Sequence, residues 1–440
     1  MPPTTRSKLR TVLQNLGLVA LSCVFALLLV EFGLRLFVQP SDRAFGELFG
    51  HQLPPLRIAA VSPPVDRTEP YESLIVEGDH ITRGDLWGYQ RPDPVLGYTT
   101  QENVVSVNGW WQSNNLGARS RQATTYTIPP GKTRVITFGD SFTQGSRVPQ
   151  DQTWTYHLDK AYPDMEVINF GVDGYSMAQA FLRFQIIEKI VEYDTVVMMF
   201  VPKSDTWRDI NTVRNLAFGW KMPYVLPRYV LEDGELRLVQ SPYADHDDVY
   251  QDNKEGISEK LKNFLRRYDR FYVDIEYESP TILQYSMIYK LIVSAIAEDA
   301  RRDVLTHRVR SDSEAIAVSR AIFERMADMV RSTGKQFLLV VLPAPQEVQR
   351  LRSDPAYFAL WSEMLRTVCG PTIPCLELRS VLLDAPAAQI DLGYDGTHYG
   401  PKANRLIARE IARRLADVTV VQNENGVTLP DRPITIAKHR

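Results

Sequence analysis

The stretch RVITFGDSFTQGSRV, residues 134–148, decides the fold and raises the first question about function. A short apolar run, residues 134–138, is followed at once by Gly-Asp-Ser, which ends at Ser141. Apolar runs of this length with β-branched residues are typical of buried strands. Ser141 and Gln144 also fit the Ser-x-x-Gln pattern of a helix N-terminus. Ser141 therefore either caps a helix or is a nucleophile held at the end of a strand.

Three further apolar runs repeat this pattern, and helical patterns separate them. The runs cover residues 166–170, 195–201 and 336–342, and the helical patterns cover residues 153–162, 177–193 and 313–335. Such alternation predicts a parallel sheet with helices on both faces. The fold class that we expect is a three-layer, flavodoxin-like α/β sandwich. Ligands of such sheets bind at the carboxyl ends of the strands, where Ser141 lies.

The composition is that of a globular protein. The chain has 440 residues, of which 44% are hydrophobic and 23% charged, and its formal net charge is −3. It contains no long basic run, which argues against nucleic acid as the main partner. The length allows one large domain with insertions, or two domains.

The N-terminal segment is apolar enough to cross a bilayer. Residues 16–30 carry no charge, and with their flanks, residues 12–38, they are long enough to span it. Glu31 and Arg35 lie one helical turn apart, where they can pair or reach the interface. Three basic residues precede the run, so the positive-inside rule keeps the N-terminus in the cytoplasm and exports the rest. The alternative is a cleaved signal peptide, but no small-x-small cleavage site follows the run.

The organisation that we expect follows from these boundaries. A proline-rich stretch comes after the apolar run, and a hairpin turning at Asp233-Gly234 interrupts the strand-helix rhythm. We interpret the interrupting segment as an insertion that shapes the mouth of the site. The segments are a cytoplasmic tail (1–11), a transmembrane anchor (12–38), an extracytoplasmic stalk (39–84), an α/β domain (85–420) with its insertion (203–312), and a C-terminal tail (421–440).

Two cysteines lie outside the apolar run. Cys369 and Cys375 flank a short loop rich in glycine and proline, CGPTIPC. An oxidising compartment would permit a disulfide between them. They can equally be two unrelated buried thiols, and the sequence leaves both alternatives open.

A second motif lies near the other end of the chain, in DLGYDGTHYGPKANRL, residues 391–406. Asp395 and His398 are three residues apart in a glycine-rich loop, and Pro401 is placed to begin an amphipathic helix. Such a loop presents an imidazole and a carboxylate to the same point. A base, and a group that orients the base, are what a nucleophilic serine needs. Alone, the motif would be an ordinary turn followed by a polar loop residue.

Together the two motifs resemble those of the GDSL-type esterases, the SGNH hydrolase superfamily. That family has a Gly-Asp-Ser block after its first strand and an Asp-x-x-His block before its last helix. The resemblance covers roughly residues 85–420 and extends to membrane-anchored bacterial members, which implies a bacterial cell membrane location with the catalytic domain outside. It implies that Ser141 attacks an ester carbonyl, that His398 is the general base, and that Asp395 orients His398. No cofactor and no metal are implied.

The resemblance also implies an oxyanion hole. Its donors would be the backbone N–H groups of Ser141 and of Gly171, which follows the second strand. The family's third block, Gly-x-Asn-Asp, reads Pro-Lys-Ser-Asp here: Asp205 matches the aspartate, but Ser204 replaces the asparagine. A serine hydroxyl is a shorter donor, and losing one oxyanion donor can cost about 3 kcal/mol. This departure puts the activity in doubt.

Three functions compete on this reading. The first is a serine esterase or deacylase that hydrolyses an O-acetyl or other acyl ester on an envelope carbohydrate or lipid. The second is an O-acetyltransferase for a cell-surface polysaccharide, in which a sugar hydroxyl replaces water and a partner from the envelope polysaccharide machinery handles the acyl group. The third is a non-catalytic binding or assembly module, for which Ser204 argues. Hydrolysis and transfer use the same triad, so the sequence does not separate them.

Overall fold

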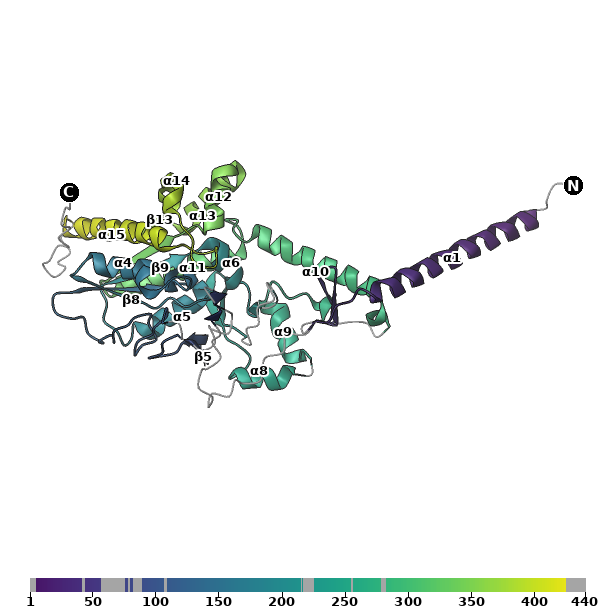
Figure 1. The fold of residues 1–440 in the computed structure, drawn as a ribbon, viewed down its shortest axis with the longest axis horizontal. Helices are drawn as coiled ribbons and strands as arrows, with labels where there is room; N and C mark the ends of the chain where they lie inside the picture. Colours follow the sequence, from purple (N-terminus) through teal and green to yellow (C-terminus); the bar gives the residue numbers. More distant parts are fainter. Residues whose placement is uncertain are drawn as a thin grey trace. The chain divides into compact units, whose positions relative to one another are not determined.

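A parallel sheet organises the larger part of the molecule (Figure 1). Within the described residues it has five strands in the order β8-β7-β9-β12-β13, all parallel. The strands are β7 (Thr133–Phe138), β8 (Met165–Asn169), β9 (Thr195–Phe200), β12 (Gln336–Val341) and β13 (Cys375–Glu377). The first four confirm the predicted strands to within one residue at each end. Because β7 lies between β8 and β9, the strand order reverses there, as in flavodoxin-like sheets.

The computed structural model describes residues 5–41, 44–56, 76–77, 80–81, 89–106, 109–214, 216, 225–254, 256–277 and 282–424. The chain divides into two compact units. One unit comprises residues 1–62, 215–223 and 250–304; the other comprises residues 63–214, 224–249 and 305–440 and contains the sheet.

Helices cover both faces of the sheet, as predicted. On one face, apolar side chains of β7, β9 and β12 share a buried cluster with α4 (Trp154–Ala161) and α15 (Pro401–Glu424), which run side by side (Figure 1). On the other face, the ring of Phe138 meets Phe184 of α5 (Met177–Ile187), with ring centroids 5.6 Å apart. The ring of Phe200 likewise meets that of Phe323 in α11 (Glu314–Ser332), at 5.2 Å. The result is a three-layer α/β sandwich.

Shorter elements complete the unit that contains the sheet. They are β3 (Val76–Glu77), β4 (His80–Ile81), β5 (Gln90–Asp93), β6 (Gly97–Thr100), α3 (Ser141–Gln144), η1 (Gln150–Gln152), α6 (Pro202–Asp209), β10 (Arg228–Glu232), β11 (Glu235–Val239), α12 (Pro345–Ser353), α13 (Pro355–Val368), α14 (Arg379–Asp384) and η4 (Ala387–Gln389). The hairpin of β10 and β11 turns at Asp233 and Gly234, whose φ angles are 53° and 82°. This confirms the turn predicted from the Asp-Gly pair.

The segment between β9 and α11 does not form a single body. The β10-β11 hairpin belongs to the unit that contains the sheet, whereas residues 250–304 group with the N-terminal segment. The helical elements concerned are α8 (His246–Asn253), α9 (Glu259–Tyr268), η2 (Asp274–Glu276), η3 (Leu283–Tyr285) and α10 (Met287–His307). The helix α9 and most of α10 therefore lie in the unit that does not contain the sheet.

The smaller unit begins with α1 (Thr5–Arg35), of which Leu13–Arg35 is long and apolar enough to cross a membrane. The hairpin of β1 (Gly46–Leu48) and β2 (His51–Leu53) follows, within the predicted stalk. Its buried Leu48 and Leu53 pack with Met287 of α10, beside Leu34 and Val38. The first part of the predicted stalk is therefore a packed hairpin, and most of the remaining stalk lies outside the described residues.

The C-terminal part of the sheet carries a disulfide between Cys369 and Cys375. It joins the residue after α13 to the first residue of β13, and it decides between the two alternatives that the sequence left open. The edge strand β13 was not predicted, because it has only three residues. The last helix, α15, continues to Glu424, beyond the predicted start of the C-terminal tail at residue 421.

A buried carboxylate joins three helices on one side of the sheet. Asp209, the last residue of α6, accepts hydrogen bonds from the N–H of Ala178 in α5 at 3.2 Å and from the hydroxyl of Ser319 in α11 at 2.8 Å. Asp209 is fully buried, and burial raises its pKa to about 6. The folded protein therefore holds this proton at pH values where an unfolded chain has already released it.

Asp209→Asn is expected to stabilise the protein at neutral pH. An aspartate whose pKa is raised by folding destabilises the fold as pH rises from its unfolded value, near 4, to about 6. Asparagine keeps an acceptor for Ala178 and avoids the buried charge, so the gain over wild type should grow across this window to at most about 3 kcal/mol and then level off. Thermal unfolding of both proteins between pH 4.5 and 7.5 measures it. A loss of stability that is equal at every pH would contradict the prediction.

Candidate active site

The serine follows a turn that requires glycine. Gly139 follows β7 with a φ of 150°, and a Cβ there would overlap the hydroxyl of Thr143 and lie 3.0 Å from the carbonyl oxygen of Met199. The next residue, Asp140, caps α3, because its Oδ1 accepts the N–H of Phe142 at 2.9 Å. The interpretation of Ser141 as the helix cap is therefore wrong. Ser141 is the first residue of α3, and its side chain is free for another contact.

That contact is with the predicted base. Ser141 Oγ lies 2.8 Å from His398 Nε2, although the two residues are 257 positions apart in the chain. On the other side of the imidazole, His398 Nδ1 lies 2.7 Å from Asp395 Oδ2. The ring of Phe142 stacks on the imidazole with centroids 4.4 Å apart, which fixes the plane of the ring. Serine, histidine and aspartate thus stand in the order that nucleophilic catalysis requires.

The loop of residues 393–398 holds the aspartate in place. Asp395 Oδ1 accepts the N–H groups of Thr397 and His398 at 2.9 Å and 3.1 Å, and Oδ2 also accepts the hydroxyl of Thr397. Burial by itself would raise the pKa of Asp395. The hydrogen bond and charge of His398, together with the hydrogen bonds from Thr397, nevertheless hold that pKa well below its ordinary value. Asp395 is therefore an acceptor that stays ionised across the working pH range of a histidine base.

Arg147 is a further member of this site that the sequence did not reveal. Its Nε lies 3.2 Å from Asp395 Oδ2, and its Nη2 lies 3.2 Å from Asp173 Oδ2. Its carbonyl oxygen accepts the N–H of Tyr394 at 3.3 Å. Burial would lower the pKa of Arg147, but the two carboxylates raise it above its ordinary value. Arg147 therefore holds the loop through its backbone and places a cation on the triad carboxylate through its side chain.

Arg147→Met is expected to lower kcat/KM by about tenfold to 10²-fold, because Asp395 loses the cation that holds its carboxylate in place and the triad is no longer aligned. Arg147→Lys keeps a positive charge beside Asp395 and is the control, with a smaller loss. Steady-state kinetics on a simple acetyl ester measure both variants. An unchanged kcat/KM in Arg147→Met would mean that the side chain of Arg147 does not position the triad.

The backbone N–H groups predicted to form the oxyanion hole differ in whether they already donate a hydrogen bond. Within the described residues the N–H of Ser141 has no acceptor, so it is available to a ligand. The N–H of Gly171 already donates to Asn169 Oδ1 at 2.9 Å. A Cβ at Gly171 would lie 2.5 Å from the backbone nitrogen of Gln144, so glycine is needed here for close packing as well. Ser204 lies in the first turn of α6 with a half-buried side chain.

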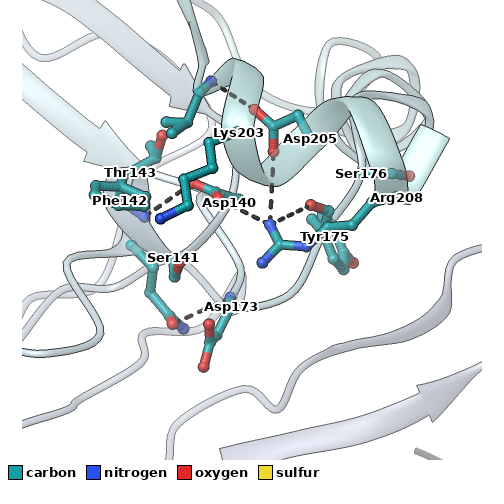
Figure 2. Close-up of polar contacts among 12 residues, drawn as sticks. Asp140, Ser141, Phe142, Thr143, Asp173, Tyr175, Ser176, Lys203, Asp205 and Arg208 are labelled. Atoms are coloured by element: carbon teal, nitrogen blue, oxygen red, sulfur yellow. Dashed lines mark hydrogen bonds and ion pairs between the residues drawn. The ribbon is translucent and has the colours of Figure 1, made fainter. Parts of the chain in front are cut away.

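Lys203, beside Ser204, connects α6 to the triad loop. Its Nζ donates to Gln346 Oε1 at 3.1 Å, and Gln346 Nε2 donates to the carbonyl oxygen of Thr397 at 3.3 Å. In the view of Figure 2 its side chain extends from α6 in the direction of the segment that carries Ser141. Burial lowers the pKa of Lys203. A cationic donor therefore stands next to the position where the family pattern has asparagine.

A buried charge cluster lies behind the serine. Figure 2 shows the guanidinium of Arg208 between the carboxylates of Asp140 and Asp205. Arg208 Nη1 donates to Asp140 Oδ2 at 2.8 Å and lies 3.6 Å from Asp205 Oδ1. Asp205 Oδ2 accepts the N–H of Val201 at 2.6 Å, which ties the start of α6 to β9. Burial first, and then the charge of Asp140, raise the pKa of Asp205 well above its ordinary value.

Comparisons with known proteins give only distant likenesses. No family model matches the chain, and no curated protein matches it. Among solved structures, it is similar to a member of the lipolytic protein G-D-S-L family from Veillonella parvula (12% identity, TM-score 0.29, covering 64% of this chain and 97% of that one). It is also similar to a lipase/acylhydrolase from Enterococcus faecalis (14%, 0.31, 64% and 95%) and to an acetylxylan esterase from Geobacillus stearothermophilus (12%, 0.30, 66% and 96%).

Proposed function

We propose that the protein is a serine hydrolase of the SGNH type that cleaves an acyl ester through Ser141, His398 and Asp395. The observation that carries the proposal is the continuous chain of contacts from Ser141 Oγ to His398 at 2.8 Å and from His398 to Asp395 at 2.7 Å. A helix-capping serine would not need an imidazole at this distance. A structural histidine would not need both an ionised carboxylate and a serine hydroxyl on its two ring nitrogens.

The chemistry follows from the positions of these atoms. Ser141 Oγ attacks the ester carbonyl while His398 Nε2 takes its proton, and Asp395 stabilises the imidazolium that forms. The tetrahedral intermediate collapses when His398 returns the proton to the leaving alcohol, which leaves the acyl group on Ser141. Water, activated by the same imidazole, then attacks the acyl-enzyme and releases the acid. A hydroxyl of a second molecule in place of water would give transfer instead.

The oxyanion hole that we propose uses the N–H groups of Ser141 and Gly171, with Ser204 as a weak third donor. Gly171 can contribute only if its N–H is shared with, or released by, Asn169 Oδ1. One fully available backbone donor is fewer than acyl-transfer enzymes commonly use. A replacement at position 204 therefore has room to improve catalysis.

Ser204→Asn is expected to raise kcat/KM on a simple acetyl ester by up to tenfold, which corresponds to about 1.4 kcal/mol. The longer amide donor reaches further and points in a fixed direction. Ser204→Ala should cost less than the 10²–10³-fold that follows the loss of a well-placed donor. Steady-state kinetics of the three proteins provide the comparison. A large loss in Ser204→Ala would show that the serine already acts as a full donor.

The acyl group that we propose is an acetyl or similarly small group. Ser141 exposes only 2% of its surface, so a small acyl group reaches Oγ with the least rearrangement of the residues around it. The helix α1, together with the basic residues that precede its apolar part, supports a single-pass anchor with a cytoplasmic N-terminus and the triad outside. On that side of the membrane the accessible esters are those of envelope carbohydrates and lipids.

A fluorophosphonate probe tests the proposal directly. The full chain in detergent or nanodiscs should form a covalent adduct at Ser141, identified by mass spectrometry of the labelled peptide. Release of acetate from an acetylated oligosaccharide, with and without an unacetylated oligosaccharide as acceptor, then separates hydrolysis from transfer. If wild type and Ser204→Asn show neither labelling nor acyl turnover, the catalytic proposal is refuted and a binding module takes its place.

A further inference from the structure

Aromatic side chains are exposed at the point where α1 ends. The rings of Phe37 and Phe49 have centroids 6.1 Å apart, and these residues are 58% and 68% exposed. Phe45, four residues before Phe49, is 55% exposed. Phe37 comes two residues after the apolar segment Leu13–Arg35, and Phe49 occupies the turn of the β1-β2 hairpin. Exposed aromatic residues at this position are unusual for a surface that faces only water.

The start of α10 is fixed to the last turns of α1. Glu31 of α1 accepts the N–H groups of Met287 and Ile288 at 2.6 Å and 3.2 Å, and the hydroxyl of Ser286 at 3.0 Å. Arg35 pairs with Glu31 at 3.2 Å, as the sequence suggested, and also donates to the carbonyl oxygen of Tyr285. A side chain of α1 thus supplies the acceptors for the free N–H groups at the beginning of α10. This arrangement sets the position of Tyr285 along α1.

That position lies within the apolar segment. A groove is lined on one side by Val24, Leu27 and Leu28 of α1 and on the other by Tyr285 and Ile288. Leu28 lies seven residues, or about 10 Å, before the end of the apolar segment at Arg35. If α1 spans the bilayer, residues beside Leu28 lie at or below the level of the lipid headgroups. Tyr285 is nevertheless 68% exposed.

We infer that Phe37, Phe45, Phe49, Tyr285 and Ile288 form a juxtamembrane surface that inserts into the lipid headgroup region of the membrane spanned by α1. The inference rests on the proposed membrane span and adds to it a second contact, made by residues 282–288 of a segment far away in the sequence. Tyrosine favours the headgroup level, where its ring is in an apolar region and its hydroxyl is wet, and phenylalanine rings bury apolar area at the same boundary. Arg35, whose side chain is 48% exposed, lies beside this surface and offers a cation to lipid phosphates.

The surface fits lipid better than a protein partner because it is continuous with α1. Tyr285 and Ile288 line the same groove as Leu27 and Leu28, so this part of the surface directly adjoins the spanning segment. A protein partner would have to occupy the same volume as the acyl chains around Leu27 and Leu28. The consequence is that the smaller unit is held by the bilayer at two places, the spanning helix and the juxtamembrane surface.

Environment-sensitive labels on the full chain in nanodiscs test this inference. Phe49→Cys and Tyr285→Cys are each made in a Cys23→Ser background and labelled with a nitrobenzoxadiazole maleimide, while the disulfide stays oxidised. Native Cys23, exposed within the apolar segment, is the positive control for the span. Asp299→Cys is the matched control in the same unit, because Asp299 is on α10 with a side chain that is 81% exposed. Nitroxide lipids labelled near the headgroup or deep in the acyl chain serve as quenchers.

The expected result is blue-shifted emission at positions 49 and 285, with stronger quenching by the shallow nitroxide than by the deep one. Cys23 should show the opposite depth preference, and position 299 should emit as in water without quenching. Water-like emission at positions 49 and 285, with Cys23 quenched, would overturn the inference and leave the anchor standing. Blue-shifted emission without lipid quenching at 49 and 285 would assign the surface to a protein contact and also overturn it. Water-like emission at Cys23 would refute the membrane span and the inference together.

Discussion

Ser141→Ala is expected to lower ester turnover by about 10⁴-fold or more and to remove all fluorophosphonate labelling. Without Oγ there is no nucleophile, and water must attack the ester unaided except for any donors that stabilise the oxyanion. The fold should not change, because the cap of α3 is Asp140 and the remaining serine atoms are retained by alanine. Acetate release and probe labelling measure the effect. Ser362→Ala, at a half-buried serine on α13 outside the triad, is the control and should keep wild-type activity.

His398→Ala should cost nearly as much, and the double variant should be little worse than either single one. The two side chains act as a unit: the serine is a poor nucleophile without a base, and the base has nothing to activate without the serine. Additive losses in kcat would mean that Ser141 and His398 act in separate steps, which would contradict the triad. Labelling at Ser141 that survives in His398→Ala would contradict it as well.

Arg208→Met is expected to destabilise the fold by about 3–5 kcal/mol, because it leaves the buried Asp140 carboxylate without its cation. Asp140 is completely buried, and its other oxygen caps the helix that begins with Ser141. The loss should therefore appear in two measurements. Urea unfolding should report the lower stability, and the rate of fluorophosphonate labelling should fall in conditions where the variant is still folded.

Substitutions of the two carboxylates beside Arg208 test whether the lost stability comes from an unpaired buried charge. Asp205→Asn should be well tolerated, because asparagine keeps an acceptor for the N–H of Val201 and removes a charge that burial already disfavours. Asp140→Asn combined with Arg208→Met should recover part of the stability lost in Arg208→Met alone, since the unpaired charge is gone. A double variant that is less stable than Arg208→Met would show that Arg208 acts through packing and not through charge.

The strands were predictable because their signal is local. Each of the four long strands is a short, mostly apolar run, and most of its residues are buried, so the pattern marks both of its ends. The edge strand β13 has three partly buried residues, which is too short a run to stand out. The helix predicted over residues 177–193 ends at Ile187, because the chain turns there and places Val191 and Tyr193 in the core before β9 begins. Tertiary packing, which no local pattern encodes, sets that boundary.

The residues of the site could be predicted only where they belong to a short sequence motif. Ser141, Asp395 and His398 stand in two short blocks, and the sheet brings the blocks together. Arg147 and Lys203 carry no such pattern, because their partners lie far away in the sequence and a single basic residue is ordinary in a loop or a helix. The sequence does not distinguish Asp140 as the cap, because the serine beside it fits the same capping pattern.

The wide separation of Ser141 and His398 along the chain has a consequence for when the enzyme becomes active. Synthesis delivers the serine 257 residues before the histidine, and the two meet only after the last strand and helix have assembled on the sheet. In a chain exported as we propose, that assembly is completed outside the cytoplasm. A growing or partly translocated chain would carry the serine without its base. If the chain is exported as we propose, the order of the motifs delays activation until the whole domain has crossed the membrane.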